Sequence, residues 1–214
     1  MANKVVVVGG GGHAKVIIDI LQTSGNYEVV GFTSQSDKER SLCGTPYLGD
    51  DSTLEELYRS GIQSFFTAVG DNKIRRKIFD RLVEMGFKSV NAISPFACVS
   101  SYATIGEGVI IMPGAIINAY ACIGDNVIIN TKASVDHDCC IGSHVHIAPG
   151  STIAGSVSIG EGTFIGAGST LIPGIEVGGW SVIGAGSVVI SNIPSNVKVV
   201  GVPAKKYINK DGEL

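Results

Sequence analysis

The feature that most constrains this chain is a strict six-residue repeat between residues 93 and 189. Every sixth residue of this stretch is aliphatic, without exception. An amphipathic helix repeats every ~3.6 residues and a strand every two, so a period of six fits short strands separated by regular corners. Such a period is typical of a parallel β-helix. The aliphatic positions are Ile93, Val99, Ile105, Ile111, Ile117, Ile123, Ile129, Val135, Ile141, Ile147, Ile153, Ile159, Ile165, Leu171, Val177, Ile183 and Val189.

A second restricted set of residues follows four positions after each aliphatic. Most of its members are small, as at Ala103, Ala121 and Ser169, and we expect both sets to point inward. Three hexads form one triangular coil, so residues eighteen apart become vertical neighbours on strands roughly 4.8 Å apart. Glycine often follows the aliphatic directly, as at Gly106 and Gly142. We expect it at corners where φ is positive or two backbones come close.

The chain before residue 92 carries a different pattern. Buried-strand signals at 5–8, 28–33, 64–69 and 88–92 alternate with helical patterns at 16–21, 53–60 and 73–85. This alternation predicts a small parallel α/β unit of Rossmann-like type. We therefore divide the chain into a Rossmann-like domain (1–91), an all-β parallel β-helix (92–194) and a C-terminal tail (195–214).

A run of four glycines follows the first predicted strand. Gly9, Gly11 and Ala14 satisfy a G-x-G-x-x-A spacing between a strand and a helix. Backbone amides at such a turn hold a phosphate or diphosphate against the helix N-terminus. His13 would either contact that phosphate or cap the helix. A full NAD site also needs an acid closing the second strand, where residues 33–34 read Thr-Ser. We expect a nucleotide diphosphate, with a purely structural turn as the alternative.

The composition excludes several partners. The formal net charge is −3, which gives no electrostatic reason to expect nucleic acid or an anionic membrane as partner. No apolar run reaches the length of a membrane span and no signal peptide is recognisable, so a cytoplasmic location is expected. Five cysteines, an odd number, favour free thiols. Cys122 and Cys140 are eighteen apart, and we expect them to be stacked, reduced packing residues.

Three of the four histidines of the chain lie between residues 137 and 146. His137 occupies an outward hexad position, and its expected vertical neighbours are Ala119 and Gly155, which leave open space. An imidazole oriented between Asp136 and Asp138 can act as a general base. The Gly155 amide can face a developing oxyanion. The arrangement suits acyl transfer.

Two other readings of this cluster stay open. The histidines can be solvated surface residues, or they can bind a metal, because His and Cys at close spacing are zinc ligands elsewhere. Against the metal, Cys139 is at an inward hexad position. Asp138 and His144 share one hexad phase, while His146 has another. No metal is expected.

These motifs make the chain resemble the hexapeptide-repeat acyltransferases, which form left-handed parallel β-helices. It resembles in particular a two-domain branch that includes sialic acid O-acetyltransferases and N-acetyltransferases acting on nucleotide-linked 4-amino-4,6-dideoxy sugars. The matching stretches are the G-G-G-G-H-A-K loop (9–15), V-D-H-D-C (135–139), V-H-I-A-P-G (145–150) and G-V-P-A-K (201–205).

The resemblance implies a homotrimer, with acetyl-CoA lying between neighbouring subunits. His137 would be the general base, with Asp138 as its acidic partner, and His146 and the Gly155 amide would contact the acetyl thioester. The residues implied for acetyl-CoA are His146, Gly155, Ala185, Gly201, Pro203 and Lys205. Those expected to bind the nucleotide sugar are Gly9, Gly11, Gly12, His13, Thr33, Ser34 and Asp37.

The predicted function is acetyl-CoA-dependent N-acetylation of a 4-amino-4,6-dideoxy sugar carried by a nucleotide, with UDP as the expected nucleotide. One alternative keeps the enzyme class but makes the acceptor a hydroxyl group, as in sialic acid O-acetylation. Another is a non-catalytic trimeric scaffold that binds a nucleotide sugar. A zinc-dependent hydration enzyme is the last, and it would require stoichiometric metal.

Overall fold

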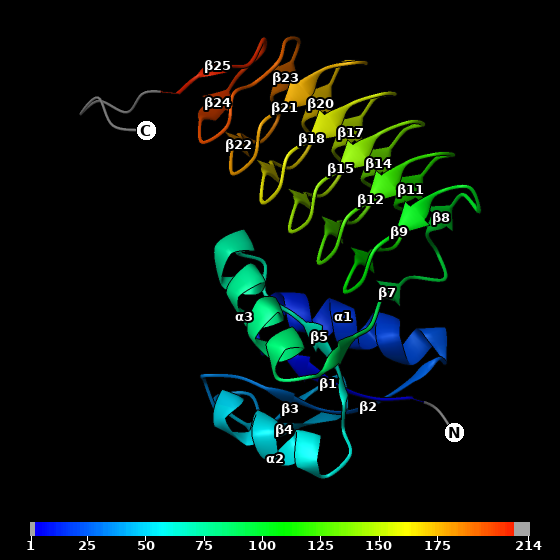
Figure 1. Ribbon diagram of the computed structural model, residues 1–214, viewed down its shortest axis with the longest axis vertical. Coiled ribbons are helices and arrows are strands. Elements are labelled where there is room, and N and C mark those ends of the chain that lie inside the picture. The colour runs from blue at the N-terminus through cyan, green and yellow to red at the C-terminus, as the bar shows by residue number, and fades with distance from the viewer. Residues whose placement is uncertain (1–2, 208–214) are drawn as a thin grey trace. The chain divides into compact units, whose positions relative to one another are not determined.

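A computed structural model describes residues 3–207. The chain forms two compact units, Met1–Pro95 and Phe96–Leu214, and each is described by itself. Figure 1 shows an α/β unit in the first part of the chain and a stack of short strands in the second. Within the described residues, no helix combines the length and the apolar character that crossing a membrane requires.

The first unit is built on a six-stranded sheet in the order β3-β4-β2-β1-β5-β6. All neighbouring strands are parallel except β3 and β4, which form an antiparallel hairpin. The strands are β1 (Asn3–Val8), β2 (Tyr27–Thr33), β3 (Ser41–Leu42), β4 (Thr45–Gly49), β5 (Ser64–Thr67) and β6 (Lys88–Ser89). The helices are α1 (Gly12–Ser24), the 3-10 turn η1 (Asp51–Thr53), α2 (Leu54–Arg59) and α3 (Asn72–Glu84).

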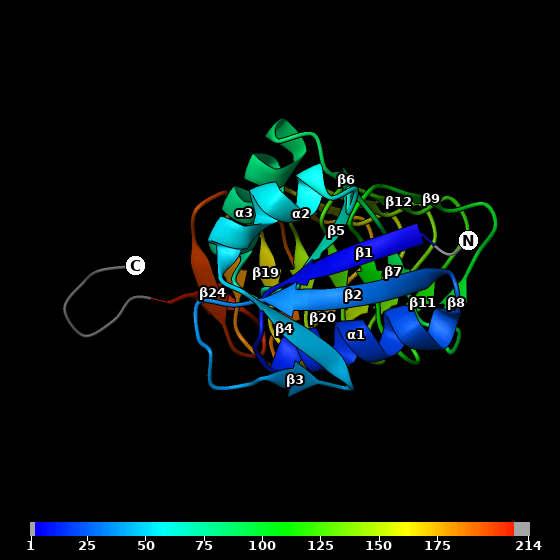
Figure 2. The same cartoon turned by 90° about the horizontal axis from the view of Figure 1, so that it is seen from below.

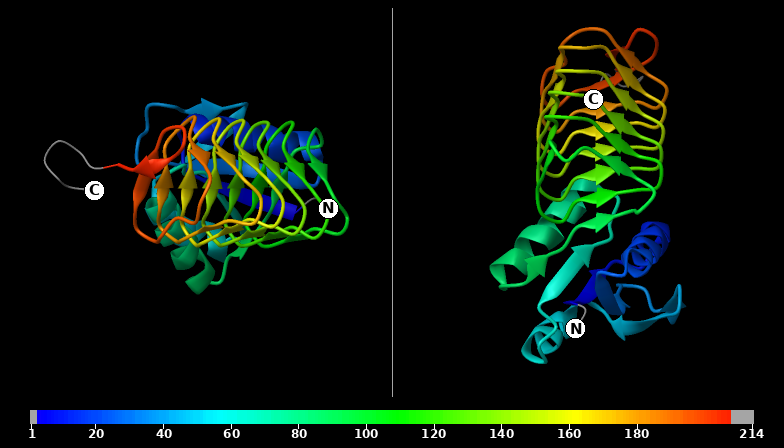
Figure 3. Two further views of the ribbon diagram at one scale, coloured as in Figure 1. Left: turned by 90° about the horizontal axis from the view of Figure 1, so that it is seen from above. Right: turned by 90° about the vertical axis from the view of Figure 1, so that its right-hand side faces the viewer.

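Helices cover both faces of this sheet (Figures 2 and 3). Val6 and Val8 of β1 lie in one hydrophobic cluster with Leu54 of α2 and Phe79 of α3, while α1 covers the other face. The continuous burial of residues 5–8 explains why β1 reads as an unbroken valine run. The predicted Rossmann-like alternation of strands and helices is confirmed.

The β3–β4 hairpin was not predicted from the sequence. Its two-residue turn places Cys43 at φ 48° and Gly44 at φ 75°, the left-handed pair of a type I′ turn. Such turns are usually signalled by Asn-Gly or Asp-Gly, and Cys-Gly carries no comparable signal. The strands on either side are also too short to show a periodic pattern.

The second unit is a triangular prism of two-residue strands, one in every six residues (Figure 3). Its first face runs β10-β13-β16-β19-β22-β24-β25, its second face β8-β11-β14-β17-β20-β23 and its third face β9-β12-β15-β18-β21. The strand β7 (Ala92–Ile93) precedes the boundary between the units. The others are β8 (Cys98–Val99), β9 (Thr104–Ile105), β10 (Ile110–Ile111), β11 (Ile116–Ile117), β12 (Cys122–Ile123), β13 (Ile128–Ile129), β14 (Ser134–Val135), β15 (Cys140–Ile141), β16 (His146–Ile147), β17 (Thr152–Ile153), β18 (Ser158–Ile159), β19 (Phe164–Ile165), β20 (Thr170–Leu171), β21 (Glu176–Val177), β22 (Val182–Ile183), β23 (Val188–Val189), β24 (Lys198–Val200) and β25 (Lys205–Lys206).

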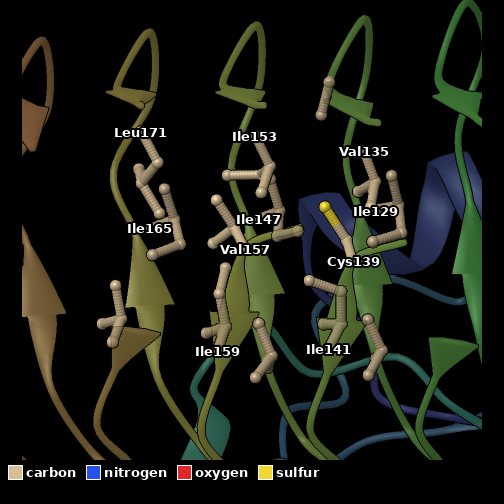
Figure 4. Packing of buried hydrophobic residues seen from close by; sticks show 14 of the residues in the cluster. Ile129, Val135, Cys139, Ile141, Ile147, Ile153, Val157, Ile159, Ile165 and Leu171 are labelled. Carbon is tan, nitrogen blue, oxygen red and sulfur yellow. The ribbon is translucent and has the colours of Figure 1, made fainter. Parts of the chain in front are cut away.

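The interior of the prism is the predicted aliphatic ladder. Strands eighteen residues apart pair in parallel and in register, so that Ile117 lies beside Val135 and Ile129 beside Ile147. These side chains form one continuous hydrophobic core, part of which is drawn in Figure 4. The parallel β-helix predicted from the hexads is therefore confirmed. The first face also gains β24, which pairs in parallel with β22 beyond the point where the six-residue spacing stops.

In each corner, the glycine that follows the aliphatic and the residue that has a positive φ are at different positions. Positive φ falls two residues after the expected glycine position, as at Asn126 (φ 54°) and His144 (φ 63°). The glycine that follows the aliphatic is required by close approach instead. A Cβ atom on Gly142 would lie 2.7 Å from the backbone nitrogen of Glu161 in the next coil. The close approach of two backbones, and not a positive φ, therefore explains these glycines.

Cys122 and Cys140 are stacked and free, as expected, because they lie side by side on adjacent strands of the third face without a disulfide. The expectation that they are packing residues is wrong, because both are exposed. The first residue of each two-residue strand points outward and the second points inward, as Ile123 and Ile141 do. Only Cys139 is buried, and Figure 4 shows it among the aliphatic columns.

Candidate active site

The candidate site is the corner formed by residues 136–139, between β14 on the second face and β15 on the third face. Asp136 fixes the backbone of this corner. One of its carboxylate oxygens, Oδ1, accepts hydrogen bonds from the His137 amide at 2.8 Å and from Asn118 Nδ2 at 2.8 Å. Those bonds, the backbone one first, lower the pKa of Asp136. Asn118 lies one coil before Asp136, and the eighteen-residue rule could have identified it.

His137 projects from this corner with its side chain 59% exposed. Its Nδ1 lies 2.7 Å from Asp138 Oδ2. This hydrogen bond, followed by the charge of Asp136, raises the pKa of His137 above 6.5. We expected the ring to sit between two carboxylates, but only Asp138 contacts it. With Asp138 accepting the Nδ1 proton, the neutral tautomer leaves Nε2 as an acceptor.

Gly155 lies against the His137 ring, as the vertical spacing predicted. A Cβ atom on Gly155 would be 2.7 Å from both Cε1 and Nε2 of the imidazole, so any side chain there would displace the ring. The next amide, that of Ser156, donates to the His137 carbonyl at 2.9 Å. Within residues 3–207, the Gly155 N–H donates to no backbone carbonyl among the turn contacts. The corner therefore combines a basic nitrogen with an amide donor beside it.

The other two histidines of the cluster are elsewhere. His144 is buried in the corner between the third and first faces, with its Nδ1 2.9 Å from Asn126 Nδ2. His146 lies on β16 of the first face, where its Nε2 is 3.1 Å from Asn130 Nδ2. Its ring also meets Phe164 edge-on at 5.0 Å. No group of three or more His, Cys, Asp or Glu residues is placed to hold a metal in the described part of the chain.

In a triangular prism, each corner lies opposite the one face that does not take part in forming it. His137 is on the corner between the second and third faces, while His146 is on the first face. Within one chain the two side chains therefore point in opposite directions. His146 takes the outward position of its strand, while Ile147 is in the core, although His146 itself is only 8% exposed.

Cys139 does not add a nucleophile to the corner. It is fully buried, and its thiol lies 3.1 Å from the Ala154 carbonyl. Burial is the main cause that raises its pKa, so the thiol stays protonated and unreactive.

The residues expected to border CoA lie near the C-terminal end of the prism. Ala185 is exposed on the corner between the first and second faces. The tail docks nearby, since the Gly201 carbonyl accepts from the Val188 amide at 3.1 Å. Pro203 is exposed on the loop that follows, and Lys205 is exposed at the start of β25.

The third face carries a groove of about 770 Å³. It is lined by small side chains and backbone, including Cys140, Gly142, Ser158 and Gly160, and it extends to Pro194. The lining begins at Cys122 on β12 and continues past Cys140 on β15, which follows the His137 corner directly, so the groove passes beside the candidate base. Its largely apolar lining follows the length of the third face, which suits an extended chain rather than a compact ligand.

In the first unit, the glycine loop connects β1 to α1. Gly9 has φ 126°, and a Cβ atom there would lie 2.6 Å from the Ala68 carbonyl oxygen, so this position needs glycine. Gly11 caps α1 without a side-chain hydrogen bond. No atom would lie within 4 Å of a Cβ on Gly11 or Gly12. The N-terminus of α1 therefore faces open space, as a phosphate-binding turn requires.

His13 lies in the first turn of α1. Burial, and then the charge of Arg75, lower its pKa to about 4, so its imidazole is neutral at physiological pH. Arg75 is fully buried, and its Nη1 donates to Asn72 Oδ1 at 2.9 Å and to the Gly70 carbonyl at 3.2 Å. Sequence analysis missed this buried cation, because Arg75 reads as one of several basic residues on an amphipathic helix.

The residues after β2 have local partners. The Thr33 hydroxyl is buried and donates to Asp51 Oδ1 at 3.0 Å. Ser34 Oγ accepts from the Ser36 amide, and Asp37 is an exposed carboxylate beside Arg40. Sequence analysis overlooked Asp51, which also binds Arg81 at 3.0 Å. Through its bond to Thr33, the last residue of β2, Asp51 places a carboxylate at the carboxyl end of that strand.

A parallel β-helix with a carboxylate-bound histidine on one corner defines a transferase of the hexapeptide-repeat class. Residues 4–82 match the family model described as PglD N-terminal domain, and residues 123–155 and 156–191 match that described as bacterial transferase hexapeptide (six repeats). The chain therefore belongs to the two-domain family of nucleotide-linked amino-sugar N-acetyltransferases, as its similarity to solved structures over nearly their whole chains shows.

Among solved structures, the chain is 45% identical to perosamine N-acetyltransferase from Caulobacter crescentus, in complex with CoA and GDP-perosamine, with a TM-score of 0.92 over 95% of this chain and 96% of the other. It is 36% identical to the acetyltransferase domain of PglB from Neisseria gonorrhoeae in complex with acetyl coenzyme A, with a TM-score of 0.88 over 97% and 100%. UDP-N-acetylbacillosamine N-acetyltransferase of Bacillus subtilis is 40% identical over 111 residues, about half of each chain. The chain thus spans about half the length of the curated relatives it matches.

Proposed function

We propose that this chain is an acetyl-CoA-dependent N-acetyltransferase acting on the amine of a nucleotide-linked 4-amino-4,6-dideoxy sugar, with His137 as its general base. The observation that carries the proposal is the exposed His137 imidazole, bound to Asp138 through Nδ1 and lying on Gly155. The relatives support the substrate class, since one is solved with CoA and GDP-perosamine and another acts, by name, on a bacillosamine derivative.

The reaction follows from the geometry of the corner. The sugar amine attacks the thioester carbonyl carbon, a C–N bond forms, and His137 Nε2 takes the amine proton. The Gly155 N–H stabilises the oxyanion. The C–S bond then breaks, and the imidazolium returns its proton to the departing CoA thiolate. A positioned base contributes roughly 10²–10⁴-fold to the rate, and one oxyanion donor roughly 10²–10³-fold.

The site needs two copies of the chain if both His137 and His146 serve one acetyl group, because they point in opposite directions from one prism. The same holds for Ala185 and the 201–205 loop, which belong to the corner opposite the groove beside His137. A homotrimer in which one prism presents its His137 corner to the first face of the next would bring these residues together. Cyclic symmetry gives three equivalent sites.

The glycine loop would hold the diphosphate of the acceptor. Gly11 and Gly12 offer the open N-terminus of α1, which favours an anion. The neutral His13 can donate or accept a hydrogen bond there without adding charge. Thr33 has its hydroxyl committed to Asp51, so the nucleoside contacts proposed for residues 33–37 fall chiefly on Ser34 and Asp37.

The experiment is an acceptor panel. Purified protein with acetyl-CoA is given UDP- and GDP-linked 4-amino-4,6-dideoxy sugars and CMP-sialic acid, and release of free CoA thiol is followed. We expect turnover with an amino sugar and none with the sialic acid. Turnover with the hydroxyl acceptor alone would establish the O-acetyltransferase alternative. Binding of acetyl-CoA without any turnover would favour the scaffold.

A further inference from the structure

Two tyrosines are exposed on the same corner of the prism as His137. Tyr102 and Tyr120 are 67% and 64% exposed. They are eighteen residues apart, and their ring centroids lie 5.7 Å apart at an interplanar angle of 37°. Two adjoining rings left in water lose the stabilisation that burial would give, so the pair forms an apolar surface without a partner in its own prism.

The backbone of Tyr120 is a second unusual feature. Its φ is 61°, in the left-handed region that bulky side chains disfavour. The next two coils have the same conformation at the equivalent place, with φ 59° at Asp138 and 60° at Ser156, whereas Tyr102, one coil earlier, does not have a positive φ. Asparagine or glycine would fit with less strain. Stability of the fold therefore does not explain an aromatic residue at this position.

The two tyrosines lie on the same corner as the proposed base, in the two coils that precede it. The Asp138 amide donates to the Ala119 carbonyl at 3.2 Å, so the two corners are in contact through their backbones. Tyr120 is thus one coil, roughly 4.8 Å, from Asp138, and Tyr102 is one coil further. Ala119, next to Tyr120, has only a methyl group, which leaves room beside the imidazole.

The rings lie on one particular side of His137. Gly155, whose amide faces the acetyl thioester in the proposed function, lies against the ring from the next coil toward the C-terminus. The tyrosines lie toward the N-terminal coils, and the groove of the third face begins at Cys122, directly after Tyr120. With the thioester carbonyl on the Gly155 side of the imidazole, we expect the attacking amine on the opposite side, where the acceptor meets Tyr120.

We propose that Tyr102 and Tyr120 form an aromatic platform that binds the apolar face and the C6 methyl group of the acceptor sugar. This inference rests on the proposed function. Tyrosine faces offer broad apolar area with a polar rim, which suits a deoxysugar. The platform favours a 6-deoxy sugar over its 6-hydroxy counterpart. A nucleobase is not the occupant, because the ribose and the diphosphate separate it from the reacting amine.

The test compares Tyr120→Asn with Tyr120→Phe. Asparagine accepts the left-handed backbone and removes the ring, while phenylalanine keeps the ring and serves as the matched control. For Tyr120→Asn we expect the KM for the amino-sugar nucleotide to rise about tenfold, with the KM for acetyl-CoA unchanged. The preference for the 6-deoxy acceptor over the 6-hydroxy acceptor should fall by a similar factor. Tyr120→Phe should retain both values.

Three outcomes decide the matter. An acceptor KM and a selectivity that stay at wild-type values in Tyr120→Asn and in the Tyr102→Ala, Tyr120→Asn double variant would overturn the platform. A loss of assembled mass in these variants, measured by light scattering, would also overturn it and make the pair a subunit contact. If the wild-type protein acetylates no nucleotide sugar of the panel, the proposed function fails, and the platform fails with it.

Discussion

At the scale of single residues, the proposed chemistry involves three neighbouring residues, His137, Asp138 and Gly155. Asp138 fixes the tautomer of His137, and Gly155 provides a flat surface beneath the ring. Asp136 does not touch the imidazole but holds the backbone that carries it. Because these residues act in different ways, we expect small substitutions at each of them to affect turnover differently.

Replacing Asp138 by asparagine should change the pH dependence of turnover. A general base must be neutral to accept a proton, and the bond from Asp138 is the largest cause that raises the pKa of His137 above 6.5. In wild-type protein, activity should therefore rise as the pH passes above 6.5. In Asp138→Asn this rise in activity should occur at lower pH, while the plateau kcat falls because the ring is less well oriented. A kcat–pH profile measures both, and a rise at unchanged pH would contradict the account.

Replacing Gly155 by alanine should displace the His137 ring. The new methyl group would lie 2.7 Å from Cε1 and Nε2, so the imidazole must rotate away from the position of the acetyl group. We expect kcat to fall about 10²-fold with little change in thermal stability. Ser156→Ala, one residue further on the same corner, is the control and should turn over normally. Equal kcat in both variants would exclude a role for the Gly155 position.

At the scale of the elements, the two units use different devices to place backbone amides. The prism turns a corner every six residues, and most corner amides bond to carbonyls of the neighbouring coil, as Asp138 does to Ala119. The α/β unit instead ends β1 with glycines, so that α1 begins in open space without a side-chain cap or an acidic residue in its first turn. An uncapped helix N-terminus attracts anions.

Gly12→Asp separates stability from binding at this helix. An aspartate in the first turn should stabilise α1 by about 0.3–1 kcal/mol, because the first turn holds no acidic residue. The same charge should repel the diphosphate and raise the KM for the nucleotide sugar about tenfold or more. Gly12→Ala is the control and should leave this KM near the wild-type value. Melting temperature and KM measured together test the idea, and an unchanged KM in Gly12→Asp would remove the loop from the acceptor site.

The sequence predicted the elements of this fold more completely than its contacts. The six-residue period leaves one arrangement for the aliphatic columns, so the prism and the vertical pairing of His137 with Gly155 followed from counting. The β3–β4 hairpin did not, because its Cys-Gly turn and two-residue strand leave no periodic signal. Arg75 and Asp51 were also missed, since their partners depend on side-chain orientation, while Asn118 could have been found by counting eighteen residues back from Asp136.

At the scale of the whole molecule, an active site within one chain is incomplete in our account. His137 and His146 point in opposite directions from the prism, and a corner cannot reach the opposite face of its own triangle. Only a neighbouring copy can supply the second histidine. In the proposed function, trimer formation is then a condition for activity.

Mixing two inactive variants tests this sharing of residues. His137→Ala and His146→Ala should each be nearly inactive alone. In trimers formed from an equal mixture, about a quarter of the sites combine an intact His137 from one chain with an intact His146 from the next. We therefore expect activity to recover to about a quarter of the wild-type value after co-refolding or co-expression. No recovery would mean that both histidines act within one chain or at different sites.

The most direct test of the central claim is the turnover number of His137→Asn with acetyl-CoA and the preferred amino-sugar nucleotide. Asparagine retains a polar side chain of similar reach but cannot accept the amine proton at neutral pH. The account predicts that kcat falls by about 10²–10⁴-fold, while the KM for acetyl-CoA stays near that of the wild-type protein. A kcat equal to that of the wild type would contradict it.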